Sequence, residues 1–407
     1  MNSGWKECKL GNLISLEYGK SLDGYRESFG KYPVYGTNGK IGNADSFLSP
    51  IPSIIIGRKG AYRGVHYSKL PFYVIDTAFY VKPKTENIDL LYLYNFLLTL
   101  DINAKDSGSA IPSTDRYEIY DIDIMLPSRA EQRAIAGVLS SLDDKIDLLH
   151  RQNKTLEGMA EALWRKMFVE EANPGLKKGK LGDYLKVQGG YAFKSSDFKE
   201  SGEIGIIKIT NISAGLVDII NTQFVNRKII ETLDHKFKIA TGSILIAMTG
   251  AEIGKIGIVE KTEKEIWLNQ RVGMFCEIRK YGNLLGFFAL NSEEGQEHIL
   301  SSATGSAQPN ISSTGIEDFE MTVVPDSILN IFGIAAQLFF DKICFNLGQI
   351  RTLSHIRDTL LPKLMGGEVR IAPFGSVQGG ADANIPEIDR LPGGTGITRE
   401  KRIKNDL

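Results

Sequence analysis

The residues best suited to binding chemistry in this chain are cations and polar side chains that follow short apolar runs. One such run ends at Ile56 and another at Ile246, and a glycine-containing loop follows each of them. Arginine, lysine and amide side chains on loops can donate hydrogen bonds to base edges or to phosphate groups. A solvated turn would have the same composition, so the residues alone leave both interpretations open. The loop residues are Arg58, Lys59, Tyr62 and Arg63 after the first run, and Thr249, Glu252 and Lys255 after the second.

Two further sets of residues could contact a ligand. Gln270 and Arg271 could make paired hydrogen bonds to a base, but they lie beside an expected strand and could equally belong to its edge. Ser109 and Ser306 occupy repeated Gly-Ser-Ala loops, where a hydroxyl and the backbone could hold a phosphate, although a structural turn is the simpler explanation. Of 15 tyrosines, 12 lie in residues 1–127, and packing on strands accounts for most of them.

Catalytic and metal-binding motifs are missing from the sequence. The five histidines form no His-Glu-x-x-His motif, the three cysteines form no Cys-x-x-Cys pair, and no Gly-x-Ser-x-Gly elbow occurs. Segment 250–255 resembles a phosphate loop, but one residue too few separates its glycines, and Ile256 stands where Ser or Thr would bind magnesium. The Asp/Asn-Pro-Pro-Tyr/Phe signature of adenine methyltransferases is also missing. We therefore expect no catalytic residue, metal ligand or cofactor in this chain, which disfavours a self-contained methyltransferase or nuclease.

The composition is typical of a soluble protein with two domains. A chain of 407 residues, with 42% apolar and 24% charged residues, is too long for one ordinary core. The chain begins without an apolar signal segment, and its longest apolar stretch, 328–340, is interrupted by Asn330 and Gln337 and is too short to span a bilayer. Three scattered cysteines suit a reducing compartment. These features predict a cytoplasmic protein that makes no membrane contact.

The charge balance gives no support to nucleic-acid binding. The net charge is −1, residues 1–127 carry 14 Lys/Arg against 14 Asp/Glu, and residues 171–325 carry 17 against 19. A nucleic-acid binder usually has a basic surplus. Any basic surface must therefore come from the arrangement of the charges, or partner subunits must supply some of the phosphate contacts.

The second half of the chain repeats the first. The offset between matching residues varies in the early part of the repeat and is constant in its last part. Segment 9–11 (Lys-Leu-Gly) returns at 180–182 with an offset of 171, and Gly60-Ala61 returns with an offset of 190. From Gly108 onward the offset stays at 197: Gly-Ser-Ala-Ile-Pro at 108–112 returns as Gly-Ser-Ala-Gln-Pro at 305–309. Because loops tolerate insertions and packed helices do not, each copy consists of a variable globular part and a helix of constrained length.

The first helix is predicted to begin after Ser128. Ser128 and Glu131 have the spacing of a capping box, and apolar residues then alternate by four and three for more than four heptads. A helix over 129–170 would be roughly 60 Å long, too long to be buried in one small domain, so it needs a partner along its length.

The matching helix of the second copy supplies that partner. Its apolar seam runs from Phe332 to Leu364 and is interrupted by Asn346 and Arg357. Asn153 in the first seam and Asn346 in the second are either polar core positions that set the register or residues that turn to solvent where the seam drifts. Pro362 should kink or end the second helix near its last turn, before Gly366-Gly367.

These patterns predict an α+β fold with two mixed α/β domains joined by two long helices in a pseudo-twofold coiled coil. Apolar β-rich runs predict strands at 54–56, 244–246, 72–81 and 267–278, and apolar segments predict short helices at 90–100 and 284–290. We place the first domain at 1–127, the first helix at 128–172, the second domain at 173–325, the second helix at 326–370, and a mostly disordered Pro/Gly-rich tail at 371–407.

The alternation of two variable domains and two repeated helices resembles the specificity (S) subunit of type I restriction-modification enzymes. The phrases that carry this resemblance are Gly-Ser-Ala-Gln-Pro-Asn-Ile at 305–311, Trp-Leu-Asn-Gln-Arg-Val-Gly at 267–273, Leu-Leu-Pro-Lys-Leu-Met-Gly-Gly-Glu at 360–368 and Glu-Gln-Arg-Ala-Ile at 131–135. The second counterpart of the last phrase, near Ile328, lacks the Glu-Gln, so the start of the second helix is less well defined. The resemblance covers about residues 5–370.

The resemblance implies a non-catalytic subunit that reads a split sequence in double-stranded DNA, with one domain for each half-site. It also implies that the paired helices are antiparallel, that they set the spacing, and that they dock two modification (methyltransferase) subunits, with restriction (translocase/nuclease) subunits as further partners. S-adenosylmethionine, ATP and magnesium would then belong to those partners. The alternative from the residues alone is a scaffold whose duplicated domains bind protein or glycan.

Overall fold

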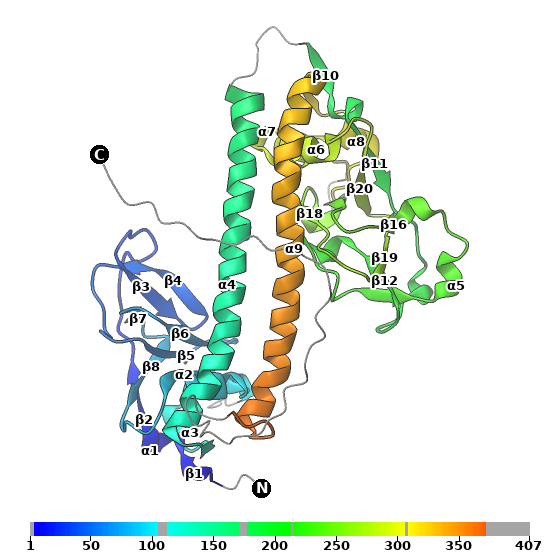
Figure 1. Ribbon diagram of the computed structural model, residues 1–407. Coiled ribbons are helices and arrows are strands. Elements are labelled where there is room, and N and C mark those ends of the chain that lie inside the picture. The colour runs from blue at the N-terminus through cyan, green and yellow to red at the C-terminus, as the bar shows by residue number, and fades with distance from the viewer. Residues whose placement is uncertain (1–3, 105–111, 171–176, 214, 306–307, 372–407) are drawn as a thin grey trace, which may run out of the picture.

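The protein is described by a computed structural model covering residues 4–104, 112–170, 177–213, 215–305 and 308–371 (Figure 1). The two long helices α4 (Arg129–Arg165) and α9 (Asp326–Met365) run side by side through the molecule, and one α+β domain lies at each end of the pair, on opposite sides. Residues 166–170 add a π-helical turn to α4. The predicted fold class is confirmed, while the predicted tail at 371–407 lies, apart from Ile371, outside the described residues.

The N-terminal domain is built on a four-stranded antiparallel sheet with the order β2-β8-β5-β6. A three-stranded sheet, β4-β3-β7, lies beside it, and the pair β1-β9 closes the domain near the start of α4. The strands are β1 (Lys6–Lys9), β2 (Ile14–Tyr18), β3 (Tyr32–Gly36), β4 (Gly39–Ala44), β5 (Ser53–Gly57), β6 (Val65–Ser68), β7 (Tyr73–Val74), β8 (Ala78–Pro83) and β9 (Asp123–Leu126). The helices are α1 (Leu10–Leu13), α2 (Leu90–Leu98) and α3 (Arg116–Tyr120).

The C-terminal domain repeats this sheet and extends it. Its six-stranded sheet has the order β11-β20-β17-β18-β14-β13, and the four-stranded sheet β15-β12-β19-β16 and the pair β10-β21 complete the domain. The main strands are β10 (Lys178–Lys180), β11 (Leu185–Gly189), β12 (Ile204–Ile207), β17 (Ile244–Ala247), β18 (Ile256–Ile258), β19 (Glu265–Leu268), β20 (Val272–Glu277) and β21 (Glu320–Thr322). The shorter strands are β13 (Ile212–Ser213), β14 (Gly215–Val217), β15 (Gln223–Val225) and β16 (Lys238–Ile239), and the helices are α5 (Arg227–Ile230), α6 (Gly282–Asn291), α7 (Glu293–Ser302) and α8 (Ser313–Glu317).

The predicted strands and short helices fall on these elements, with one refinement. Each of the segments 72–81 and 267–278 divides into two strands that belong to different sheets. The order β11-β20-β17-β18 reproduces β2-β8-β5-β6, so the duplication seen in the sequence is a duplication of sheet topology.

The antiparallel direction of the helix pair follows from its cross-contacts. Asp143 on α4 forms an ion pair with Arg357 on α9 at 3.0 Å, while Phe168 at the far end of the first helix packs against Phe332 at the start of α9. The residue numbers of such pairs add to about 500. Combined with the offset of 197, this places the pseudo-twofold axis beside Gln152, which itself matches Gln349 in the second copy.

A buried amide pair lies close to this axis. Asn346 donates a hydrogen bond of 2.8 Å from Nδ2 to Oδ1 of Asn153, and the two residues are 0% and 5% exposed. The interpretation of both asparagines as polar core positions is confirmed, and the solvent-facing alternative is wrong. A pair of amides in an otherwise apolar seam favours the one register in which they meet.

The start of α4 differs from the predicted capping box in one respect. The Ser128 hydroxyl accepts the Glu131 N–H at 3.3 Å, as predicted. The Glu131 carboxylate, instead of turning back to the cap, accepts hydrogen bonds from the Trp5 indole and from both Nε and Nη2 of Arg370. Glu131 therefore links the N-terminal segment to the residues that follow α9.

Helix α9 begins and ends without side-chain capping. Pro325 occupies its N-cap position, and the helix continues for three residues past Pro362 before Gly366 ends it. By length and composition alone α9 could cross a membrane, which corrects the expectation that its apolar stretch is too short. The core helix of a soluble protein passes the same test, and α9 packs along α4 and into the C-terminal core.

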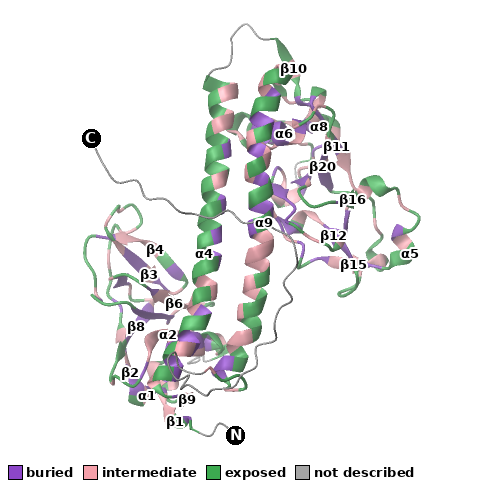
Figure 2. Ribbon diagram, in the orientation of Figure 1, coloured by how far each residue is buried: buried purple, intermediate pink, exposed green. Residues whose placement is uncertain are grey.

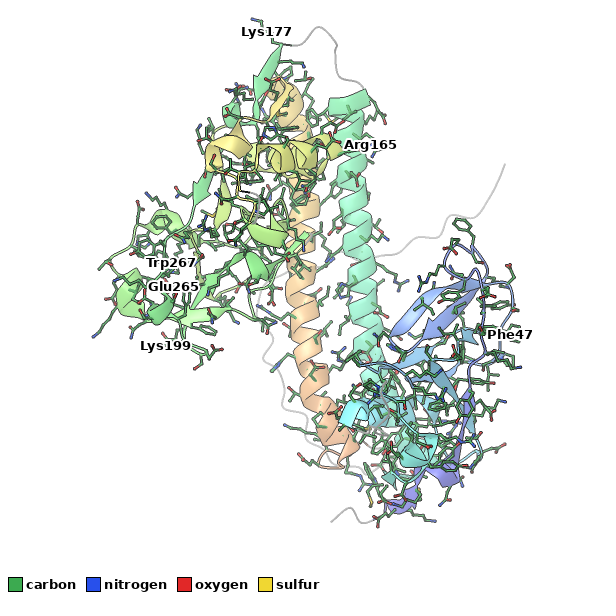
Figure 3. The ribbon with its side chains drawn as sticks, turned by 180° about the vertical axis from the view of Figure 1, so that it is seen from behind. Phe47, Arg165, Lys177, Lys199, Glu265 and Trp267 are labelled. Carbon is green, nitrogen blue, oxygen red and sulfur yellow. The ribbon has the colours of Figure 1, made fainter. Side chains whose placement is uncertain are left out.

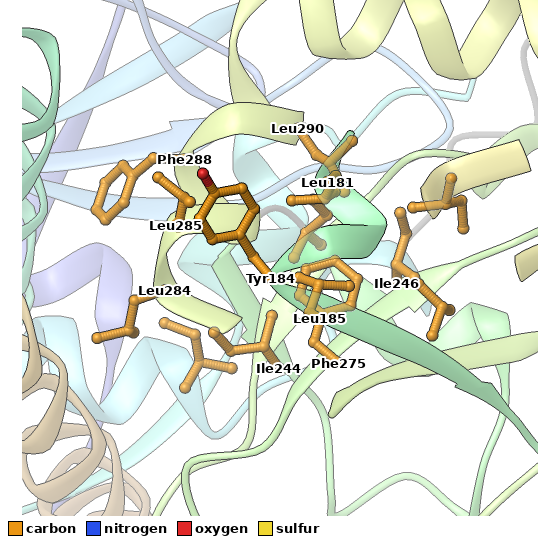
Figure 4. Close-up of a cluster of buried hydrophobic side chains, with 14 of the residues drawn as sticks. Leu181, Tyr184, Leu185, Ile244, Ile246, Phe275, Leu284, Leu285, Phe288 and Leu290 are labelled. Carbon is orange, nitrogen blue, oxygen red and sulfur yellow. The ribbon is translucent and has the colours of Figure 1, made fainter. Parts of the chain in front are cut away.

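The two largest cores lie where each domain meets the helices, and between them α4 is mostly exposed while α9 is mostly half-buried (Figure 2). In the C-terminal core, Tyr184 is fully buried among leucines and isoleucines of the sheet and α6 (Figure 4). Its hydroxyl accepts the Val324 N–H at 2.6 Å, so the chain two residues before α9 is held by the domain core. This hydrogen bond ties the start of α9 to the C-terminal domain, in addition to the apolar packing of the helix in the core.

Candidate nucleic-acid interface

In the N-terminal domain the loop after β5 is held by the segment that precedes α3. Gly60 donates its backbone N–H to the Pro112 carbonyl at 2.9 Å, and the Thr114 N–H donates to the Arg58 carbonyl at 2.9 Å. Gly60 has a φ of +118°, a left-handed conformation that glycine adopts without strain. The loop predicted to bind a ligand and the loop containing Pro112 therefore form one edge of the domain.

The C-terminal domain builds the same edge with equivalent residues. Gly250 donates to the Pro309 carbonyl at 2.9 Å, and Ile311 donates to the Met248 carbonyl at 3.0 Å. Gly250 also has a positive φ, of +72°. The repeat therefore preserves a loop junction whose backbone is constant and whose side chains differ.

Three of the four candidates in the first domain have exposed or half-exposed side chains at this edge. Tyr62 is 63% exposed, and the Lys59 ammonium pairs with Asp76 at 3.1 Å. The Arg58 guanidinium lies 4.8 Å from the centroid of the Tyr18 ring and donates to the Asp76 carbonyl at 3.3 Å. These residues are positioned to meet a ligand.

Two of the candidates are buried and hold the loops together. Arg63 is 3% exposed and donates from Nη1 to the Gly60 carbonyl at 3.1 Å and from Nη2 to the Asn103 carbonyl at 2.9 Å. Thr249 is 4% exposed, and its hydroxyl donates to the Pro309 carbonyl at 3.1 Å. Their predicted contact with DNA is not supported by these positions, because their donors are already used inside the fold.

The remaining candidates of the second domain gather at its edge. Arg271 is exposed and donates from Nη1 to Oδ1 of Asn310 at 3.2 Å, and the neighbouring Gln270 is exposed, with its backbone held by the Tyr191 carbonyl at 2.9 Å. Lys255 forms an ion pair with Glu252 and leaves 45% of its side chain exposed. Ser109 and Ser306 lie outside the described residues, so their predicted role stays a prediction.

The strand before Gln270 is anchored in the domain core. Trp267 is 2% exposed, and its indole N–H donates to Oε1 of Glu265 at 3.3 Å. Figure 3 shows both residues in the part of the domain that lies away from the helix pair, with Lys199 nearby. Strand β19 thus ends at Leu268, and only Asn269 separates it from the exposed Gln270–Arg271 turn.

Sequence reasoning missed several residues at these edges. Tyr18 and Tyr117 are 45% and 63% exposed, although the sequence predicts strand packing for most tyrosines, and Arg116 lies over both rings. In the second domain, Asn310 and Tyr191 had not been singled out. The excess of tyrosine in residues 1–127 was the signal that pointed to the first group.

Two pKa shifts at the first edge have clear physical causes. The hydrogen bond from Arg116 to the Tyr117 hydroxyl, 3.3 Å long, holds the pKa of the guanidinium above its usual range. Burial lowers the pKa of His66, which lies beneath the loop against Gly64. Within the described residues, no group of three or more His, Cys, Asp and Glu side chains is arranged to hold a metal ion.

Comparison with known proteins identifies relatives along most of the chain. A family model described as "Type I restriction modification DNA specificity domain" matches residues 2–158 and 173–330. The MjaIX and MjaVIII type I restriction enzyme specificity subunits of Methanocaldococcus jannaschii are 29% and 26% identical. The first match covers 69% of both chains, and the second covers 75% of this chain and 79% of its relative.

A solved structure shows the same fold. The crystal structure of the type I restriction-modification S subunit from M. genitalium superposes with a TM-score of 0.65 at 19% identity. The match covers 89% of this chain and 96% of the other. At this identity the likeness concerns the fold, including the two domains and the helix pair.

Proposed function

Since this chain belongs to the type I restriction modification DNA specificity family, we propose that it reads a bipartite target in double-stranded DNA, one half-site for each domain. The observation that carries this proposal is the repeated loop edge, with Gly60 held by Pro112 in one domain and Gly250 held by Pro309 in the other. Two equivalent edges related by a pseudo-twofold axis suit two half-sites of one duplex.

Footprinting of the chain in complex with its modification subunit tests this proposal. Two protected half-sites separated by an unprotected spacer are expected. Exchange of residues 1–127 for those of another family member should change the sequence of one half-site and leave the other unchanged. One continuous footprint would contradict the proposal. Binding that does not weaken as salt rises would favour the protein- or glycan-binding scaffold instead.

We further propose that α4 and α9 together set the spacer. Their length is the same in both copies from Gly108 onward, and the buried Asn153–Asn346 pair holds one register. Insertion of four residues after both Gln152 and Gln349 lengthens the pair by about one turn, or about 5.4 Å. The spacer should then grow by one or two base pairs, since base pairs are spaced about 3.4 Å apart.

The control for this insertion is the double substitution Gln152→Ala and Gln349→Ala, which alters the same sites without changing the length. Mapping of methylated adenines in cells that carry each variant gives the spacer directly. An unchanged spacer in the insertion variant would show that the helices do not measure it.

The helices also offer surfaces on which modification subunits could dock. Ile331, Ile334 and Leu338 share one face at the start of α9 and are 64%, 58% and 66% exposed. We propose that this face binds a modification subunit, and that the face containing Val138 and Leu148 on α4 binds a second one. S-adenosylmethionine, ATP and magnesium would be bound by the modification and restriction partners of such a cytoplasmic complex, and this chain would contribute no catalytic group.

The two docking faces are unequal, which gives a sharp test. The α4 positions equivalent to Ile331, Ile334 and Leu338 are Ala134, Gly137 and Ser141. Leu338→Glu should therefore weaken binding of one modification subunit and leave a complex with a single subunit, measurable by native mass spectrometry. Leu300→Glu, at a residue of α7 that is 61% exposed, is the matched control. Retention of both subunits in the Leu338 variant would show that this face of α9 does not bind a modification subunit.

A further inference from the structure

The N-terminal domain carries a partly exposed cluster of arginines and aromatic rings at its loop edge. The guanidinium carbons of Arg58 and Arg116 lie 4.8 and 5.4 Å from the centroid of the Tyr18 ring. Arg116 also lies 5.1 Å from the Tyr117 ring, and buried Phe79 packs against Tyr18 at 5.0 Å. We call these five residues, Tyr18, Arg58, Phe79, Arg116 and Tyr117, the Tyr18 platform.

The platform holds positive charge without neutralising it. Among the ion pairs of the described residues, none involves Arg58 or Arg116, whereas the neighbouring Lys59 is paired with Asp76. Aromatic faces attract a cation and orient it, but they leave its N–H donors able to bind an anion or a hydrogen-bond acceptor. With Tyr18 and Tyr117 exposed, this site can be reached from solvent.

The fold does not require this cluster, as the second domain shows. Tyr18 is paired with Phe79 in the β2–β8 register, and the equivalent pair of β11 and β20 is Gly189 with Gly273. The residues equivalent to Arg58, Arg116 and Tyr117 are Met248, Ser313 and Thr314.

Met248 is 7% exposed, and a Cβ added at Gly273 would come within 3.0 Å of its sulfur. One copy therefore fills the space with a buried methionine, while the other places the half-buried side chains of Arg58 and Arg116 there, beside the exposed rings of Tyr18 and Tyr117. Packing alone does not account for that difference, because the same backbone junction forms without the cations.

We infer that the Tyr18 platform is the base-reading element of the first half-site, with Arg116 donating to a base edge in the major groove and Arg58 supporting it. This inference rests on the proposed function. A guanidinium held against a ring presents its donors in a fixed fork, which matches the O6 and N7 acceptors of guanine. Since the second domain lacks the platform, the two half-sites are read by different chemistry and have different sequences.

The test uses the chain in complex with its modification subunit and a set of duplexes in which each base pair of the first half-site is changed in turn. Arg116→Ala should reduce discrimination at one base pair by roughly 10- to 100-fold. Arg116→Lys keeps the charge but loses the planar fork, so it should reduce discrimination at the same base pair. Selectivity for the second half-site should be unchanged in both variants, which also shows that the complex is folded.

Lys82→Ala is the matched control. Lys82 lies on β8, three residues beyond Phe79, with its ammonium 5.6 Å from the Tyr80 ring, and it is exposed. It has the same cation–ring arrangement as the platform but lies toward the other end of the strand. This variant should retain wild-type discrimination at every position of both half-sites.

Two outcomes would overturn the inference. An Arg116→Ala variant that loses affinity equally for all sequences, with a shallower salt dependence, would show a phosphate contact without base reading. A variant that binds every duplex like the wild type would show no contact at all. Either result leaves the proposed function intact as long as the wild-type complex protects two half-sites, and that protection is what the proposed function itself requires.

Discussion

Each end of the helix pair is attached to a domain, but the side-chain contacts that make the attachment differ between the two ends. At the C-terminal domain, Phe332 and Phe168 pack edge to face with centroids 5.0 Å apart, and Phe288 and Phe340 extend the aromatic cluster. At the N-terminal domain, the Glu131 carboxylate accepts hydrogen bonds from Trp5 and Arg370. A pseudo-twofold backbone therefore leaves the side chains at its two ends free to diverge.

Chain connectivity explains why the ends differ. At the C-terminal domain the chain runs on from the end of α4 toward β10, so the helix and the domain are covalently continuous. At the N-terminal domain, the equivalent connection would join the residues after α9 to the N-terminal segment. These two segments are far apart in the sequence. Glu131 replaces that connection with hydrogen bonds, and Arg370 also lies 5.5 Å from the centroid of the Trp5 ring.

The largest effect is expected from removing the aromatic anchor. Phe332→Ala empties a fully buried position and should lower the free energy of unfolding by about 3–5 kcal/mol. Chemical denaturation followed by circular dichroism measures the change. Ile331→Ala, one residue earlier on the exposed face of α9, is the control and should have little effect. Similar losses for both would mean that helix propensity, rather than the anchor, determines stability here.

A smaller loss is expected at the opposite end. Glu131→Ala removes the acceptor of the buried Trp5 indole, which should cost about 1–3 kcal/mol. Trp5 fluorescence should report local opening before the C-terminal domain unfolds. Glu161→Ala, an exposed position near the other end of α4, serves as the control. Equal losses for Glu131→Ala and Phe332→Ala would contradict the expectation that the aromatic packing stabilises the protein more than the Glu131 hydrogen bonds do.

The regular features of this fold were predictable from the sequence because they depend on local patterns. Ser128 and the heptad spacing define where α4 begins and which face it buries, and the constant offset predicts a duplicated arrangement. The partners of Glu131 were not predictable, because Trp5 and Arg370 reach it from segments more than 120 residues away. The local capping pattern was overridden by those tertiary contacts.

The candidate site was predictable in position but only partly in composition. The loops after Ile56 and Ile246 do lie at exposed edges, yet Arg63 and Thr249 turn inward there. Their burial depends on how the loops fold back onto the segments that contain Pro112 and Pro309, which no local pattern indicates. The position of the half-buried Arg116 follows from the same long-range junction.

The buried amide pair near the pseudo-twofold axis offers a way to make the helix pair more symmetric. The positions equivalent to Asn153 and Asn346 are Ile350 and Leu149, so the pair has an apolar counterpart across the axis. Replacing both amides, as Asn153→Ile with Asn346→Leu, should leave stability unchanged or raise it, because no polar group is left unpaired.

The single substitution Asn346→Leu leaves the Asn153 amide without its partner and should cost about 1–3 kcal/mol. Denaturation of the single and double variants measures both values. If the amides also hold the register, the double variant should populate more than one register. Cysteines introduced on the two helices should then form more than one set of crosslinks. Loss of stability in the double variant greater than in the single one would contradict this account.

The smallest effect is expected from the ion pair that strengthens the N-terminal half of the helix pair. Arg357 and Asp143 are 34% and 36% exposed, so solvent screens their attraction, and the pair should contribute no more than about 1 kcal/mol. A double-mutant cycle with Arg357→Met and Asp143→Asn isolates the interaction from the packing of the arginine stem. The coupling should shrink as salt is raised.

The equivalent positions at the other end are Ala160 and Phe340, both buried in the C-terminal core, where a parallel cycle should be insensitive to salt. If the two coupling energies depended equally on salt, the contacts at the N-terminal end would not be more electrostatic than those at the C-terminal end, which would contradict this account.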